Sequence, residues 1–138
     1  MSLGKACSLD KTANPEGFEA VDALVLDRLT DEERKRSAVY LDARLRPPGR
    51  AAFGGQEIEA DHNYVVAFID QRPGANWMHP CRYLLIDPAG GAVTSISADR
   101  PPVFGVLPAT WRVVWRSQNL EDWRLIPVAA TSPEQNEG

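Results

Sequence analysis

Residues 64–69, Tyr-Val-Val-Ala-Phe-Ile, are apolar at every position. Because successive side chains of a β-strand point to opposite faces of its sheet, such a run makes both faces of a strand apolar. A strand of this kind belongs in the interior of a sheet that is covered on both sides. Residues 82–86 form a second, similar run after the turn-forming residues 71–77, so we expect these two strands to form the central pair.

Shorter stretches with strand character recur at intervals of about ten residues. Residues 39–46 alternate, so Val39 and Leu41 are predicted to face the core, and Tyr40 and Asp42 to face water. Further strands are expected at 92–98, 103–107, 111–116 and 123–128. This rhythm is typical of a β-sandwich or a partly open barrel.

Two helices are expected before the first strand. From Phe18 onward, apolar residues such as Val21 and Val25 recur at helical spacing, which predicts an amphipathic helix. Thr30 and Glu33 then fit a capping box at the start of a second, short helix. The sequence therefore predicts an α+β, β-rich fold, in which one or two N-terminal helices pack on an antiparallel sandwich or partly open barrel of about six strands.

The chain of 138 residues, 43% of them hydrophobic, fits a single globular domain. We expect that domain to span residues 18–130, with a flexible lead-in at 1–17 and a flexible tail at 131–138. Residues 1–3 and 137–138 resemble cloning remnants. No apolar run approaches the roughly 18 residues that cross a bilayer. We therefore expect a soluble, cytoplasmic protein with no membrane partner.

The overall charge also limits the partners. Fifteen basic and nineteen acidic residues give a net charge of -4, which argues against nucleic acid as a partner. Residues 111–116 do carry a tryptophan stripe and an arginine stripe, as single-strand binding surfaces do. A tryptophan face in the core and an arginine face in water is the stronger interpretation.

The densest reactive cluster lies at residues 76–82. His79 and Cys81 share one face of an extended backbone, so the imidazole could draw a proton from the thiol, with Asn76 orienting the ring. This hypothesis describes a small cysteine-dependent enzyme or thiol sensor. Against it, Pro80 restricts His79, and Cys81 opens an apolar strand, where a cysteine usually packs as a small hydrophobe. Packing is the favoured interpretation of Cys81.

No metal or cofactor site is expected. Asp61 and His62 are the obvious companions of His79 and Cys81 for zinc, but a simple hairpin would hold the two histidines about 20 Å apart. A disulfide between Cys7 and Cys81 is an open alternative. The chain has no phosphate-binding glycine loop, no Gly-x-Ser-x-Gly and no His-Glu-x-x-His motif.

The loop before the second central strand is the expected contact surface. Trp77 could anchor a partner, with Arg72 and Asn76 beside it, although a loop tryptophan often caps the core. Our leading hypothesis is a non-enzymatic binding or protein-interaction module. Its partner would be a protein or a small molecule, and a homo-oligomer could form through a sheet edge.

Overall fold

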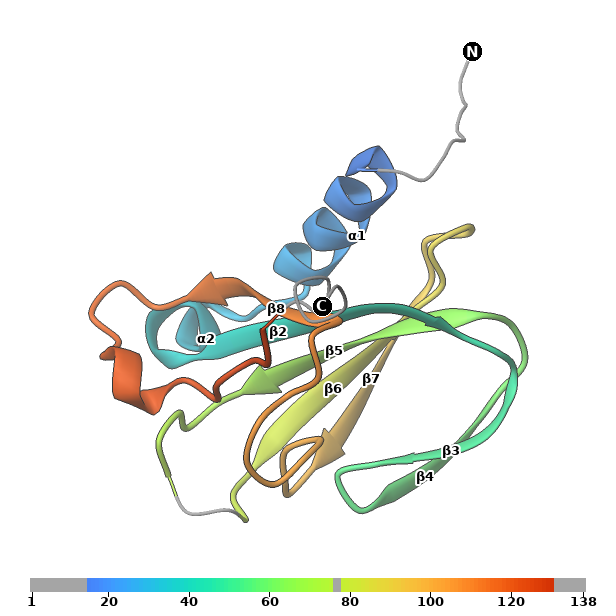
Figure 1. Ribbon diagram of the computed structural model, residues 1–138. Helices are drawn as coiled ribbons and strands as arrows, with labels where there is room; N and C mark the ends of the chain where they lie inside the picture. The colour runs from blue at the N-terminus through green and yellow to red at the C-terminus, as the bar shows by residue number, and fades with distance from the viewer. Residues whose placement is uncertain (1–14, 76–77, 131–138) are drawn as a thin grey trace, which may run out of the picture.

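The computed structural model describes residues 15–75 and 78–130, which form two α-helices, seven strands and one 3-10 helix (Figure 1). In chain order the elements are α1 (Pro15–Asp27), α2 (Asp31–Arg36), β2 (Ala38–Arg46), β3 (Gly49–Phe53), β4 (Gln56–Ala60), β5 (Tyr64–Asp70), β6 (Cys81–Ile86), β7 (Val93–Ala98), β8 (Trp111–Arg116) and η1 (Asp122–Arg124). Five strands form an antiparallel sheet in the order β7-β6-β5-β2-β8, while β3 pairs with β4 separately. The predicted α+β, β-rich class is confirmed; the described strands close no barrel.

Strand β5 lies at the centre of the sheet, between β2 and β6. All seven of its residues are buried. Val66 and Phe68 belong to the apolar cluster on one face of the sheet, and Val65 and Ala67 to the cluster on the other. The predicted doubly covered strand, and its pairing with the strand at 82–86, are confirmed.

Different parts of the chain cover the two faces. On one face the helix α1 packs through Val21 and Val25, and Leu29 follows it into the same cluster. On the other face the β3-β4 hairpin contributes Phe53, and the C-terminal segment contributes Val128. Figure 1 shows α1 and the hairpin on opposite sides of the sheet.

Both predicted helices form. Val21 and Val25 are four residues apart, so they lie on the same face of α1. At the start of α2 the Thr30 hydroxyl accepts a hydrogen bond from the Glu33 N–H at 3.0 Å, and the Glu33 carboxylate accepts one from the Thr30 N–H at 2.9 Å. This is the predicted capping box. None of the described helices has the length and apolar character that crossing a membrane requires.

The prediction that β2 exposes one face is wrong. Tyr40 and Asp42 are as deeply buried as Val39 and Leu41. The reason is that β2 is an inner strand, flanked by β5 and β8, with both faces covered near its start. The buried carboxylate of Asp42 receives a charged hydrogen bond from Arg46 Nη2 at 2.8 Å.

The β3-β4 hairpin was not predicted. Gly54 and Gly55 form its two-residue turn with φ values of 56° and 89°, a backbone that favours glycine at both positions. A Cβ on Gly54 would lie 2.7 Å from the Cβ of Ala98 and 2.7 Å from Cε1 of Tyr83. The glycine therefore lets the tip of the hairpin press directly against the main sheet.

Two predicted strands, at 103–107 and 123–128, do not form. A single parallel bridge between Leu107 and Val128 joins these segments, and residues 122–124 are a 3-10 helix. Some of their apolar residues still pack on the sheet, namely Val103, Leu107, Leu125, Ile126 and Val128, whereas Phe104, Val106 and Trp123 are exposed. The apolar spacing in these segments therefore comes from packing of part of each segment on the sheet, and not from strand pairing.

Candidate functional site

The sequence singled out His79, which lies just before β6. Its Nε2 is 2.8 Å from Oδ1 of Asp70 at the end of β5, and both side chains are more than nine-tenths buried. Burial raises the pKa of Asp70, even though the hydrogen bond with His79 acts in the opposite direction. The structure therefore gives His79 a carboxylate partner that sequence reasoning missed. Asn76 and Trp77 lie outside the described residues.

Cys81 is the first residue of β6 and is buried. Its thiol donates a hydrogen bond to the carbonyl of Arg100 at 3.3 Å. Burial, aided by the negative charge of Asp70, raises its pKa to about 12. A nucleophilic cysteine needs the opposite shift. Nothing in this geometry favours the thiol hypothesis, which stays a prediction for chemical modification to test.

Metal ligation finds no support among the described residues, which contain no group of three His, Cys, Asp or Glu side chains able to hold an ion. His62 lies within 3.6 Å of Asp61 and 3.8 Å of Asp87, at the opposite end of β5 from His79. Cys7 lies outside the described residues, so its pairing with Cys81 stays open.

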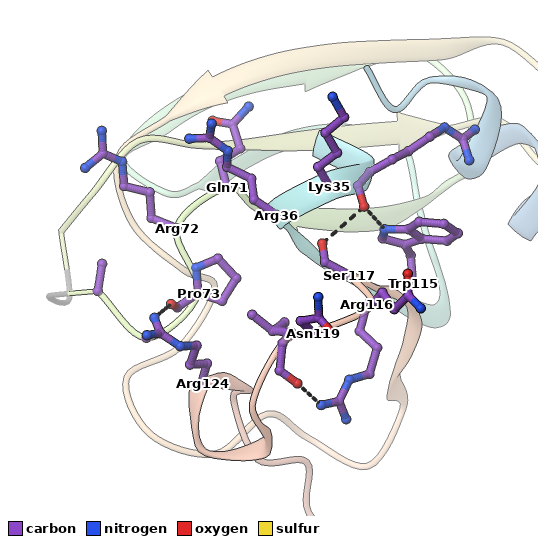
Figure 2. A pocket seen from close by; sticks show the side chains of 15 residues that line it. Lys35, Arg36, Gln71, Arg72, Pro73, Trp115, Arg116, Ser117, Asn119 and Arg124 are labelled. Atoms are coloured by element: carbon purple, nitrogen blue, oxygen red, sulfur yellow. Dashed lines mark hydrogen bonds between the residues drawn. The ribbon is translucent and has the colours of Figure 1, made fainter. Parts of the chain in front are cut away.

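A hollow of about 1010 Å³ lies where α2, the segment after β5, the end of β8 and η1 meet (Figure 2). Its lining comes from residues 34–36, 71–75 and 115–120 and from Arg124; we call it the basic cleft. Six of the 15 lining residues are basic and none is acidic. In a chain with more acidic than basic residues, this is a local concentration of positive charge. The six are Arg34, Lys35, Arg36, Arg72, Arg116 and Arg124.

Hydrogen bonds hold the segment after β5 against its neighbours in the basic cleft. Gln71 Nε2 donates to Glu33 of α2 at 2.7 Å. Arg124 Nη1 of η1 donates to the carbonyl of Pro73 at 3.1 Å, and Figure 2 shows this bond at one side of the hollow. The segment is thus tied to both α2 and η1.

The end of β8 is fixed to α2 in the same way. The Ser117 hydroxyl lies 3.0 Å from the carbonyl of Ser37 and 3.2 Å from that of Arg34, and Trp115 Nε1 donates to the Arg34 carbonyl at 3.2 Å. Figure 2 shows the two bonds to the Arg34 carbonyl, from Ser117 and from Trp115. Together these contacts close the side of the cleft opposite Arg72 and Arg124.

The basic residues of the cleft differ in how their charges are used. The Arg34 guanidinium lies over the Trp115 ring, 5.4 Å from its centroid, and is part of the wall. Within the described part of the chain, the side chains of Lys35 and Arg72 have no hydrogen-bond or ionic partner. Both residues are exposed. These two charges are therefore available to a ligand.

The other three cations are held by exposed acids. Arg36 pairs with Glu32 at 3.3 Å, Arg116 with Asp122 at 2.8 Å, and Arg124 with Glu121 at 2.9 Å. The three acidic side chains are 60% exposed or more. Exposed pairs of this kind contribute about 0–1 kcal/mol, so a ligand could exchange with them.

An exposed tryptophan adjoins the cleft. The guanidinium of Arg124 stacks on the ring of Trp123, 4.4 Å from its centroid. Trp123 is 65% exposed. A Cβ on Gly74 would lie 3.1 Å from the same ring, which places the ring beside the segment after β5. Tryptophan and arginine are enriched where partners bind. From the sequence, Trp77 was the expected anchor, and residues 123–128 were predicted to form a strand.

The tryptophan and arginine stripes of 111–116 are also arranged differently from the prediction. A register shift against β2, at Val39 and Tyr40, interrupts the alternation of β8. Trp111 consequently packs on one face of the sheet, while Trp115 packs on the other. The strand presents no continuous aromatic face.

Of the chosen residues that the structure describes, Arg72 lines the basic cleft, and His79 and Cys81 do not. The other cations come from segments that are far apart in the sequence, and a short pattern could not reveal their meeting. The run Arg34-Lys35-Arg36 was the one local signal. Comparisons with known proteins assign no family, because no family model, no curated protein and no solved structure matches the chain.

Proposed function

We propose that this domain is a non-enzymatic binding module whose basic cleft holds an anionic ligand. The observation that carries the proposal is that six cationic and no acidic side chains line one hollow of an acidic protein, and that the acids paired with three of these cations are exposed. Arginine forms paired hydrogen bonds to carboxylates and phosphates, and Lys35 and Arg72 lack competing partners among the described residues. A ligand of either chemistry would satisfy these groups.

The lining favours binding over catalysis. The residues that line the basic cleft include no His, Cys, Asp or Glu. General acid-base catalysis near neutral pH relies mainly on such groups. The amide side chains of Gln118 and Asn119 add hydrogen-bonding groups without adding a base.

The size of the hollow also bears on the ligand. Pockets for small molecules enclose about 300–1,000 Å³, so a cleft of about 1010 Å³ has room for more than one anionic group. A segment of an acidic protein, or a small molecule with several negative charges, fits this description. Either is consistent with the protein or small-molecule partner expected from the sequence.

A direct test is the binding of a fluorescein-labelled oligoglutamate peptide, followed by fluorescence anisotropy at low salt. Because Arg72→Glu places a negative charge in the cleft, we expect it to weaken binding about tenfold or more. Arg50→Glu is the matched control, since Arg50 is also exposed but lies on the β3-β4 hairpin, which is away from the elements that form the cleft (Figure 1).

Equal loss of affinity in the two variants would show that binding depends only on the net charge of the protein, and would overturn the proposal. Absence of binding to the wild-type protein, both for oligoglutamate and for inorganic polyphosphate, would overturn it as well. Added salt should weaken a specific interaction without abolishing the difference between the variants.

A further inference from the structure

We propose further that the ligand is an extended acidic peptide that adds as a new strand to the outer edge of β8 and continues into the basic cleft. This inference rests on the proposed function and specifies the ligand. It follows from the position of β8 in the sheet, from its contact with the cleft, and from its charge.

Strand β8 is the last strand of the sheet and pairs only with β2. Within the described part of the chain, no further backbone partner lies on the outer side of residues 112–116. Val113, in the middle of the strand, is 37% exposed. The N–H and C=O groups along this edge are therefore open to another chain.

The edge leads directly to the charged hollow. Trp115 and Arg116, the last two residues of β8, belong to the lining of the basic cleft. A strand laid along β8 would consequently carry its side chains to the cations there. Main-chain hydrogen bonds would supply affinity, and alternate side chains would supply specificity, as in other cases of strand addition.

Charge selects an acidic peptide over a second copy of this chain. Two arginines of β8 are already paired, Arg112 with Asp22 at 2.9 Å and Arg116 with Asp122 at 2.8 Å. Among the described residues, the unpaired cations beside the strand are those of the adjoining basic cleft, Lys35 and Arg72. A second copy of β8 would add further arginines beside these cations, whereas an acidic strand that continues into the cleft would bring carboxylates to them. The opposite edge, β7, has the sequence Val-Thr-Ser-Ile-Ser-Ala and carries no charge that would select an acidic partner. A nucleic acid would meet the same cations but has no peptide backbone to pair with the edge.

The experiment compares three labelled peptides of alternating glutamate and valine. One is unmodified, and the other two carry N-methyl groups on one or the other alternate set of backbone nitrogens, so that all three have the same charge. In a strand, one set of N–H groups faces the sheet edge and the other faces away. We expect one methylated set to weaken binding about tenfold and the other to have little effect.

Hydrogen exchange on the wild-type protein gives a second readout. The unmodified peptide should slow exchange of the amides of residues 112–116 and leave those of β7 unchanged. Equal binding of all three peptides, without protection of β8, would overturn strand addition. If Arg72→Glu still reduced oligoglutamate binding in that case, the proposed function would stand without this inference.

Two other outcomes are decisive. If neither the peptides nor oligoglutamate bind, both proposals fail. If a single-stranded oligothymidylate binds about tenfold more tightly than the unmodified peptide at the same salt, the acidic-peptide assignment is overturned and the cleft serves nucleic acid.

Discussion

The guanidinium of Arg82 donates two hydrogen bonds to the carboxylate of Glu33, from Nε at 3.0 Å and from Nη2 at 2.8 Å. Arg82 lies on β6 and Glu33 on α2, so the pair fastens the helix that carries Lys35 to the sheet. Burial by itself would raise the pKa of Glu33. The hydrogen bonds from Arg82, Thr30 and Gln71 outweigh burial, and the pKa of Glu33 is lowered.

We expect Glu33→Gln to lower the free energy of unfolding by about 2–4 kcal/mol at neutral pH, because it leaves Arg82 without its charged partner. Urea denaturation measures the change. The lowered pKa of Glu33 means that its stabilising effect is present above 4.5, the ordinary pKa of Glu33, and is lost as the pH falls through the folded-state pKa. The neighbouring Glu32→Gln breaks only an exposed pair with Arg36 and should cost less than about 0.5 kcal/mol. Similar losses in the two variants would contradict the role of Glu33.

The pair of Asp70 and His79 predicts the opposite pH dependence. Burial raises the pKa of Asp70 above 3.8, its ordinary value, so the folded protein holds this proton more tightly than the unfolded chain. The stability due to Asp70 therefore declines as the pH rises from 3.8 through the folded-state pKa. In Asp70→Asn that decline should be absent, so the stability of the variant relative to wild type should rise with pH in this window. Unfolding curves at a series of acidic pH values measure the difference.

Asp61→Asn is the control for this prediction, since the side chain of Asp61 is 94% exposed. Its stability relative to wild type should show no comparable trend in the same window. A flat difference between Asp70→Asn and wild type would mean that burial does not govern the carboxyl of Asp70.

Cys81 should resist alkylation in the folded protein. Its thiol is buried and its pKa is raised to about 12, so the reactive thiolate is scarce and poorly accessible. In a Cys7→Ser background, we expect iodoacetamide to modify native Cys81 about a hundredfold more slowly than the urea-unfolded protein, because reaction requires opening of the structure. Rapid modification near neutral pH would instead restore the hypothesis that Cys81 is a nucleophile with His79 as its base.

Asp122→Asn should strengthen the binding of an acidic peptide. Asp122 holds Arg116 at 2.8 Å and is 91% exposed, so the pair contributes little to stability but competes with a ligand for this guanidinium. We expect a twofold to fivefold lower Kd, an effect of about 0.4–1 kcal/mol, with unchanged urea denaturation. Asp61→Asn makes the same change in net charge at the far end of β5, and an equal gain there would refute competition at Arg116.

The sequence was most informative where burial and backbone geometry act together. The apolar run 64–69 predicted a doubly covered strand because a strand with this sequence is apolar on both faces. Thr30 and Glu33 predicted a helix start because the capping box uses only local contacts. Both features depend on residues close together in the chain, and both are confirmed.

The errors arose where tertiary packing overrides a local pattern. Tyr40 and Asp42 look exposed from alternation, yet β8 flanks β2 and the C-terminal segment packs over Tyr40. The β3-β4 hairpin was missed because only Ala51, Phe53, Ile58 and Ala60 of its residues pack on the sheet, which leaves no long apolar run in the sequence. The register shift in β8, which moves Trp115 to the opposite face, has no signature in the sequence.

The basic cleft could be predicted only in part, for the same reason. Arg72 was chosen because its loop looked like a contact surface. Arg116 and Arg124 join it only because β8 pairs with β2 and η1 folds back onto Pro73. The run at 34–36 is indistinguishable in the sequence from any solvated helical turn until the position of α2 is known.

The concentration of cations in one hollow of an acidic protein also governs how a partner arrives. The net negative charge of the protein repels an acidic chain, while the cations of the basic cleft attract it at short range, so collisions can be oriented before contact forms. Association with an acidic partner should therefore slow as salt is added, while dissociation, which depends on the contacts already made, should change less. The clustered arginines would then act as a guide during the encounter as well as a binding surface after it.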